Sequence, residues 1–314
     1  MLDPHFVLGR LGEVAHISRL RRYGVRDADL RAEVRGGSLI RLKPGWYATP
    51  AADAEQRRAV AIGGRLGCTS ALARYGVWAG IGDGLHVHLA RNASRRAIDG
   101  LNPTAFVPAP AVWHPRLPDR QRREIRLSDP TAPATVHWGL EADATGSLDW
   151  LVSPRTALAE AVRCLDSEHA QAVVDSAIHE RMLRRGEVER IIADAPRRTG
   201  VRVDELCGRL ESGVETLFVR RLRAGGFDVQ PQFQLAGHGR FDGIIDGVVL
   251  YEIDGWAHHR TRQQFVADRD RTLIAQAFGM PVIRVAAVRV IDDWPMIAAA
   301  VARTVADAKA GRPR

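Results

Sequence analysis

The sequence predicts an α/β (α+β) protein of several domains, and three observations carry that prediction. Helical periodicity precedes a β-hairpin pattern within residues 1–50. Prolines and short alternating segments in residues 51–150 predict a small β-rich connecting domain, and residues 151–207 predict a helical linker region. Residues 208–314 follow the order helix, three strands, helix, strand, helix, which predicts a mixed sheet flanked by helices.

Composition narrows the class of protein. A chain of 314 residues with 46% apolar and 26% charged residues is typical of a globular protein with two or three domains. The cysteines, Cys68, Cys164 and Cys207, lie far apart without metal-type spacing, which disfavours a disulfide scaffold or a structural zinc site. We find no apolar run of membrane-spanning length and no signal-peptide pattern, so we expect a cytoplasmic protein with no membrane partner.

The charge of the chain points to a polyanionic partner. The net charge is +8 and the pI is near 10.2, which favours nucleic acid as that partner. The alternative is a general arginine bias, because Lys43 and Lys309 are the only lysines.

Residues 3–50 have the element order of a winged helix-turn-helix domain. Asp3-Pro4 can cap and start a first helix, and a turn rich in proline and glycine joins the two strands of the hairpin. The second and third helices are expected at Arg19–Tyr23 and Arg26–Arg35, and the strands at Ser38–Leu42 and Trp46–Ala48.

In such a domain the third helix and the hairpin are where phosphate contacts are expected. The cations at these places are Arg26, Arg31, Arg35, Arg41 and Lys43. They predict binding to double-stranded DNA. The alternative is a protein-interaction module, because Asp27, Asp29 and Glu33 dilute the positive charge of the third helix.

This N-terminal stretch resembles the AbiEi family, the antitoxin and repressor half of a type IV toxin–antitoxin system. The residues that carry the resemblance are Ile17-Ser18-Arg19-Leu20 with Gly24-Val25, and the run from Gly37 to Ala48. The resemblance implies DNA binding and a possible toxin partner, and it extends to the pattern of the connecting domain. A homodimer is a further possibility, since winged helices often dimerise on palindromic DNA.

Residues 51–150 carry little recognisable chemistry. Leu85–Ala90 alternates like a strand, so His86 and His88 share a face and could resemble a metal-binding pair. With no third ligand nearby in sequence, we interpret them as solvent-facing histidines. Short strands are expected at Ala105–Val107 and Glu124–Leu127.

Acidic residues in the C-terminal region form the main candidate site. Glu252 and Asp254 are two residues apart in an otherwise apolar strand, so their side chains leave it on the same face. Burying carboxylates is costly unless they are paired or bound to a metal, and a divalent cation is the simplest explanation. Asp242 lies on the preceding strand.

Whether Asp242 can join Glu252 depends on the hairpin between the two strands. A two-residue turn at Asp246-Gly247 puts Asp242 on the opposite face from Glu252. A three-residue loop, Ile245–Gly247, with Gly247 left-handed, makes Asp242 diagonal to Glu252 on the same face. We therefore expect the three-residue loop or another bulge.

The element order from Ser212 onwards is that of the restriction-endonuclease-like core. This region resembles a family related to the very-short-patch-repair (Vsr) endonucleases, within the PD-(D/E)xK superfamily. The residues that carry the resemblance are Ser212-x-x-Glu215, Phe241-Asp242, Tyr251–Gly255 with His258-His259, Phe265-x-x-Asp268-Arg269-x-Arg271, and Val282-Ile283-Arg284-Val285. Asp254 stands at the usual lysine position of the superfamily, as in the Vsr-like group, so the role of that lysine is unfilled.

The resemblance implies a metal-dependent endonuclease. Hydrolysis of a phosphodiester needs a metal to polarise the phosphate and activate water, and Asp242 and Glu252 are the natural ligands for Mg²⁺ or Mn²⁺. Asp254 could complete the metal shell or orient His258, which could act as a general base. Glu215 is the remaining acid that the resemblance places in the site.

Each of the accessory residues has a structural alternative. Ser212-x-x-Glu215 is also a capping box, and His258 could simply bond to a backbone group. Arg269 and Arg271 could face the DNA or belong to a solvated helix face. For the whole chain, the first hypothesis is a DNA endonuclease, possibly in phage defence or a toxin–antitoxin context. The alternative is a DNA-binding repressor or antitoxin whose nuclease-like domain is inactive.

Overall fold

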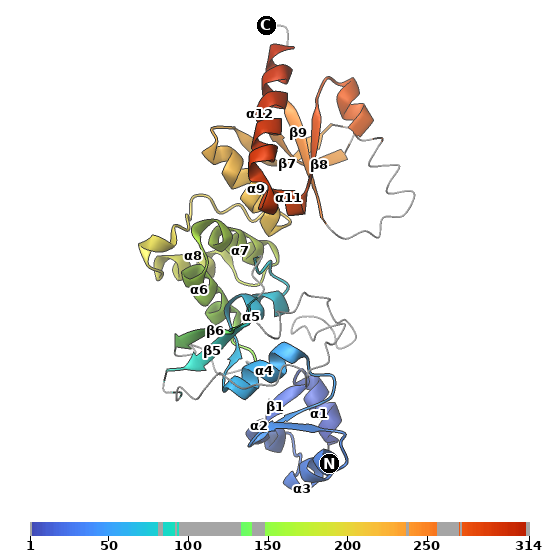
Figure 1. Ribbon diagram of the computed structural model, residues 1–314, viewed down its shortest axis with the longest axis vertical. Helices are drawn as coiled ribbons and strands as arrows, with labels where there is room; N and C mark the ends of the chain where they lie inside the picture. Colours follow the sequence, from blue (N-terminus) through green and yellow to red (C-terminus); the bar gives the residue numbers. More distant parts are fainter. Residues whose placement is uncertain are drawn as a thin grey trace. The chain divides into compact units, whose positions relative to one another are not determined.

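The computed structural model describes residues 2–80, 84–91, 93, 133–139, 148–236, 239–255, 270 and 272–311 (Figure 1). The protein is of mixed α/β class, with small sheets that are antiparallel or mixed. It divides into two compact units, one formed by residues 1–173 and 180–201 and the other by residues 174–179 and 202–314. Within the described part of the chain, no helix combines the length and apolar character needed to cross a bilayer.

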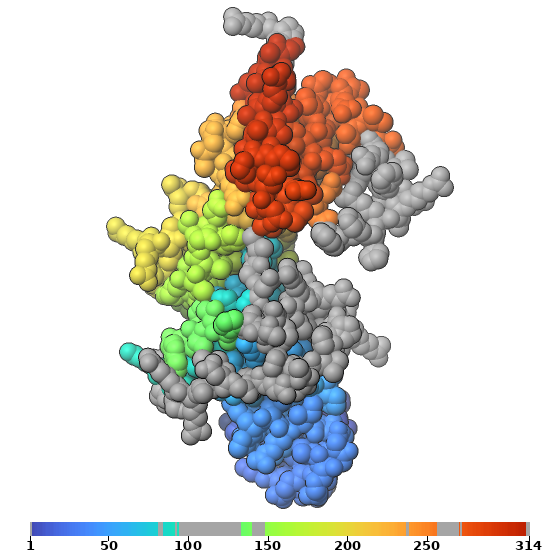
Figure 2. All heavy atoms as spheres, viewed as in Figure 1, coloured from blue at the N-terminus to red at the C-terminus, as the bar shows by residue number. Residues whose placement is uncertain are grey.

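Residues 2–50 open the first unit with short helices and a three-stranded antiparallel sheet. The elements are α1 (Pro4–Arg10), β1 (Val14–His16), α2 (Ile17–Arg22), α3 (Asp27–Arg35), β2 (Ile40–Lys43) and β3 (Trp46–Ala48). The sheet order is β1-β3-β2. Leu8, Leu20 and Leu30, one from each helix, are fully buried, and they pack in one core with Tyr47 of the sheet. In Figure 2 the N-terminal residues up to about 50 form one continuous blue lobe.

Local capping explains most of this arrangement. Asp3 accepts a 2.9 Å hydrogen bond from the His5 amide, and Pro4 takes the first helical position, as expected. Gly24 and Gly37 have positive φ values of 79° and 77°, which suits the turns that end α2 and α3. The strand β1 was not predicted, because three residues gain strand structure only by pairing with β3 far along the chain.

The rest of the first unit surrounds a second three-stranded sheet. Its elements are α4 (Ala54–Ile62), β4 (Arg65–Leu66), α5 (Cys68–Arg74), β5 (His86–Ala90), β6 (Thr135–Gly139), α6 (Pro154–Cys164), α7 (Ser167–His179, its end in the second unit), α8 (Arg185–Ala193) and a 3₁₀ turn (Arg197–Thr199). Strand β5 lies between β4, which is antiparallel to it, and β6, which is parallel. The helix α5 packs on both α6 and β5. The strands expected at Ala105–Val107 and Glu124–Leu127 lie outside the described residues.

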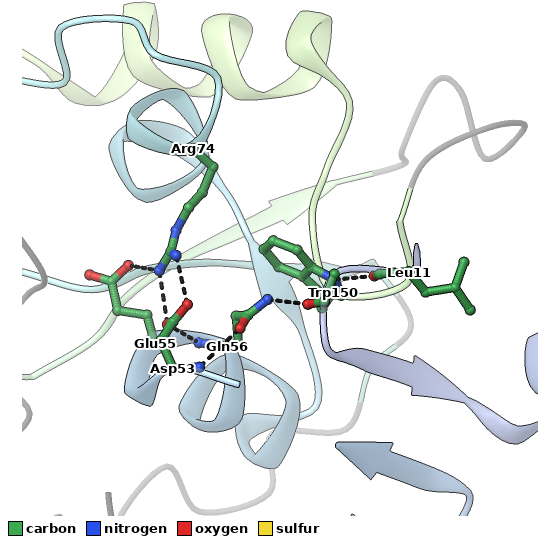
Figure 3. A network of polar contacts seen from close by, with 7 residues as sticks. Leu11, Asp53, Glu55, Gln56, Arg74 and Trp150 are labelled. Carbon is green, nitrogen blue, oxygen red and sulfur yellow. Dashed lines mark hydrogen bonds and ion pairs between the residues drawn. The ribbon is translucent and has the colours of Figure 1, made fainter. Parts of the chain in front are cut away.

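A buried ion-pair network links α4 and α5 (Figure 3). The Arg74 guanidinium is fully buried and donates to Asp53 at 2.7 and 2.9 Å and to Glu55 at 2.7 Å. Asp53 also caps α4 in a reciprocal box with Gln56, whose side-chain amide donates to the Gly12 carbonyl at 2.7 Å. Because breaking a buried pair costs about 3–5 kcal/mol, this network holds α5, α4 and the segment before β1 in one arrangement.

The second unit is built on a four-stranded mixed sheet. Its elements are α9 (Gly213–Ala224), β7 (Val229–Leu235), β8 (Gly239–Ile245), β9 (Val249–Asp254), helical residues 272–277, β10 (Val282–Ala286), α11 (Ala287–Asp292) and α12 (Trp294–Ala310). The order in the sheet is β10-β9-β8-β7, with only the β10–β9 pair parallel among these described strands.

Helices cover both faces of this sheet. On one face the Tyr251 ring of β9 lies 4.9 Å from the Phe218 ring of α9, and Phe218 also meets Trp294 at the start of α12. On the other face Leu250 packs with Ala275 of the helical segment 272–277. Successive residues of a strand point to opposite faces, so β9 is buried on both sides up to its carboxyl end. That end carries Glu252 and Asp254.

Candidate functional site

The hairpin that precedes β9 decides where the candidate acids lie. Asp246 and Gly247 both have positive φ, 51° and 66°, and the Val248 amide donates to the Ile245 carbonyl at 3.0 Å. The strand register then resumes with Ile245 opposite Val249. Three residues therefore separate the paired positions, as expected, but they are 246–248 rather than 245–247.

This loop gives Asp242 and Glu252 matching positions. The last paired residues are Gly243 and Tyr251, and continuing that register puts Asp242 directly opposite Glu252 instead of diagonal to it. The two strands part at this point. Asp242 Oδ2 accepts a 2.7 Å hydrogen bond from the Ile253 amide, so the carboxylate takes the place of a strand partner.

The Asp242 carboxyl is partly buried, and burial raises its pKa. The Ile253 amide opposes that shift, whereas the charges of Glu211 and Asp254 add to it. Asp242 is therefore a carboxylate that a nearby cation would stabilise.

Arg284 of β10 pairs with both acids of β9. Its guanidinium lies 2.5 Å from Glu252 Oε2 and 2.8 Å from Asp254 Oδ1, with a longer 3.2 Å contact to Asp254 Oδ2. The parallel register makes Arg284 the direct partner of Glu252, which is only 7% exposed. Arg284 thus places a positive charge beside both acids from the neighbouring strand.

Lys309 pairs with a different acid of this unit. Its ammonium lies 2.7 Å from Asp246 Oδ2 at the hairpin turn. The turn precedes β9, whereas Glu252 and Asp254 lie at the far end of the strand.

Glu215 combines a structural contact with an unusual charge state. Its Oε1 accepts from the Ser212 hydroxyl at 3.0 Å and its Oε2 accepts from the Glu211 amide at 3.1 Å. The Glu215 amide donates to Ser212 Oγ at 3.2 Å, so the predicted cap is present, although the side chain bonds the amide one residue before the cap. Burial, followed by the charge of Asp242, raises the pKa of Glu215 to about 7.

Two kinds of interaction connect the predicted acids. The charge of Asp242 interacts with those of Glu215 and Asp254, and Arg284 forms ion pairs with both Glu252 and Asp254. In the described part of the chain, these carboxylates do not form a set of three ligand atoms within 4.8 Å of one another. The predicted residues His258, Arg269 and Arg271 lie outside the described residues.

The predicted phosphate-contact residues of the first unit differ in their surroundings. Arg31, Arg35 and Arg41 are exposed. Arg26 is exposed as well, but Asp29 holds its guanidinium with bonds of 2.7 and 2.9 Å. Lys43 is half-buried 5.2 Å from the centre of the Trp46 ring, and this burial lowers its pKa.

Two interpretations of the middle region were wrong. His88 is not solvent-facing: it is 4% exposed, and its Nδ1 lies 2.5 Å from Glu160 Oε1. The cysteines are not all isolated, because Cys68 and Cys164 meet beside His86. The spacing of residues along the chain predicted neither the His88–Glu160 contact nor the meeting of the two cysteines, because the residues involved lie on separate elements. Arg284 was likewise missed, because its role follows from the β10–β9 register alone.

Comparison of the chain with protein-family models, curated proteins and solved structures gives no significant match. The functional assignment therefore depends on the residues and geometry described above.

Proposed function

We propose that the second unit is a metal-dependent endonuclease domain and that residues 2–50 bring it to double-stranded DNA. The observation that carries the proposal is the register of β8 and β9, which sets Asp242 opposite Glu252 where the strands part. Two carboxylates at such a position, with Glu215 close enough to feel the charge of Asp242, could hold a metal that activates a phosphodiester and a water molecule.

The donor set suits Mg²⁺ or Mn²⁺. Asp242, Glu252 and Asp254 offer only oxygen atoms, and the Ile253 amide orients Asp242 through one of its two oxygens. A bound metal would supply Lewis-acid activation of the phosphate and of a water molecule. Glu252 must then exchange part of its contact with Arg284, since the guanidinium holds its Oε2.

The protein's own residues would do the rest. Glu215, with a pKa of about 7, can hold or release a proton at neutral pH. Arg284, released from Glu252, can pair with a phosphate oxygen while still anchored to Asp254. His258, Arg269 and Arg271 stay predictions for a general base and for DNA contacts.

The element order of residues 2–50 supports the DNA-binding part of the proposal. A helix, a strand, two helices and a hairpin whose second strand pairs with the first strand are the arrangement of a winged helix. Arg31, Arg35 and Arg41 are exposed on α3 and the hairpin, where phosphates would be contacted. Arg26 would have to leave Asp29 to contribute.

A second candidate is a repressor or antitoxin with an inactive nuclease-like domain. The observation that favours it is Arg284, which pairs with both Glu252 and Asp254 and so occupies oxygens that a metal would need. On this proposal the N-terminal domain would bind the promoter of its own gene, as a homodimer or with a toxin partner. A gel shift with that promoter and a toxin-neutralisation assay test it.

A cleavage assay tests the endonuclease proposal. Plasmid and oligonucleotide duplexes are incubated with Mg²⁺ or Mn²⁺ and with the wild type, Asp242→Ala or Glu252→Ala. We expect both substitutions to reduce cleavage to background, because each removes a metal ligand, while a gel shift shows unchanged DNA binding. Cleavage that persists in both variants would exclude this site, and metal-independent binding without any cleavage by the wild type would favour the second candidate.

A further inference from the structure

Four side chains of the first unit converge on one point that the nuclease proposal does not use. They are Cys68 at the start of α5, His86 at the start of β5, His137 in β6 and Cys164 at the end of α6. One ligand atom from each lies within 4.8 Å of all the others. These elements pack around the same small sheet (Figure 1).

The distances suit a four-coordinate metal. Zn–N bonds of about 2.0–2.1 Å and Zn–S bonds of about 2.3 Å imply tetrahedral edges of about 3.3 Å between nitrogens and about 3.6 Å between nitrogen and sulfur. His86 Nδ1 lies 3.0 Å from His137 Nε2, and Cys164 Sγ lies 4.0 Å from His86 Nδ1. Small adjustments of these side chains would complete the tetrahedron.

Surrounding residues hold the cluster in place. The Cys68 amide donates to Glu160 Oε2 at 2.9 Å, and Glu160 Oε1 lies 2.5 Å from His88 Nδ1. The His86 amide donates to Ser70 Oγ at 3.0 Å. Cys68 also has a positive φ of 45°, a costly conformation for a residue with a side chain, which the neighbouring contacts maintain.

We propose that Cys68, His86, His137 and Cys164 form a structural zinc site. Two thiolates and two imidazoles are the ligand set that Zn²⁺ takes in closed sites, and hard cations such as Mg²⁺ prefer oxygen. With all four positions filled by protein, the site has no open position for catalysis. Its role is to fasten β6, an edge strand, to α5 and α6.

This role explains why ligands so far apart in the chain are brought together. His86 and His137 are 51 positions apart, and Cys68 precedes them while Cys164 follows. A metal that closes such long loops removes more freedom from the unfolded chain than one that closes a short loop. The zinc-binding free energy would add directly to the stability of the first unit.

Metal content and Co²⁺ spectroscopy on the full chain test the proposal. The purified, reduced protein should contain about one Zn²⁺ per chain, and after exchange for Co²⁺ it should show the visible bands of a tetrahedral site and sulfur-to-cobalt charge transfer. Cys164→Ser should lower Zn²⁺ affinity by more than about 100-fold, since loss of even an outer partner costs about 10–100-fold. Cys164 is exposed, so this substitution leaves no cavity in the core, and any loss of stability should match the loss of metal.

Two control variants make the result specific. Cys207→Ser removes the third cysteine, which belongs to the other unit, and Asp242→Ala removes a carboxylate of the proposed nuclease site. Both should keep the metal and the Co²⁺ spectrum, whatever the outcome of the cleavage assay. A reduced wild type without metal or thiolate bands would overturn the proposal. So would a Cys68–Cys164 disulfide that persists when Zn²⁺ is supplied, or loss of the spectrum in Cys207→Ser.

Discussion

At the residue scale, the Glu215 side chain accepts hydrogen bonds that stabilise the start of α9, although burial disfavours its charged form. Its two oxygens accept hydrogen bonds from Ser212 and Glu211 at the start of α9. Burial and the charge of Asp242 nevertheless raise its pKa to about 7 from an ordinary 4.5. Because the folded state then binds a proton that the unfolded state has released, stability falls as pH rises through this range.

Glu215→Gln should remove that pH dependence. For the wild type, the penalty grows from pH 4.5 and reaches about 3 kcal/mol above pH 7. The amide of glutamine can still accept from Glu211 and donate to Ser212 Oγ, so the helix start is preserved. Hydrogen exchange of the β8 and β9 amides at pH 5 and pH 8 measures the effect. Parallel losses of protection in the wild type and the variant would contradict the raised pKa.

At the element scale, the hairpin between β8 and β9 shows which features of the fold can be predicted from the sequence. The alternation of apolar and acidic residues predicted β9, and the need to bring Asp242 to Glu252 predicted an odd number of loop residues. The choice of 246–248 could not be foreseen, because it depends on distant contacts. The Asp228 amide donates to Asp246 Oδ1 at 2.7 Å, and Lys309 holds the other oxygen of that carboxylate.

Local sequence patterns do not predict contacts between residues that lie on separate helices and strands. The strand β10 was predicted, but the pairing of Arg284 with Glu252 follows from a parallel register that no local signal sets. The same limit applies to the cysteine and histidine cluster. Its four ligands stand on α5, β5, β6 and α6, so only packing of those elements reveals it. The cap at Ser212 was predictable because both partners lie within one turn of helix.

At the scale of the whole molecule, the net charge of +8 is the property that bears most on partners. Part of the positive charge is neutralised internally, as in the pairs Arg21–Asp27 and Arg26–Asp29 on the N-terminal domain. The exposed Arg31, Arg35 and Arg41 remain for phosphates. If this domain binds DNA as proposed, its affinity should depend strongly on salt.

Replacing Arg31, Arg35 and Arg41 together with alanine should weaken DNA binding at all sequences. If each contacts one phosphate, the slope of log affinity against log salt concentration should decrease in magnitude by about 3. Fluorescence anisotropy with a labelled duplex at several salt concentrations measures that slope. The matched triple variant Arg185→Ala, Arg190→Ala and Arg197→Ala, on and just after α8, should leave it unchanged. Equal slopes for the wild type and the N-terminal variant would place the DNA contacts elsewhere.

The central claim is that Asp242 and Glu252 form a divalent-metal site in which Arg284 competes for Glu252. Titration of Mn²⁺ into the full chain, followed by electron paramagnetic resonance, tests it most directly. The account predicts about one Mn²⁺ bound by the wild type and affinity weakened by more than about tenfold in Asp242→Asn. It also predicts tighter binding in Arg284→Met, because the guanidinium no longer competes with the metal for Glu252 Oε2. Identical Mn²⁺ binding by the wild type and Asp242→Asn would contradict the claim.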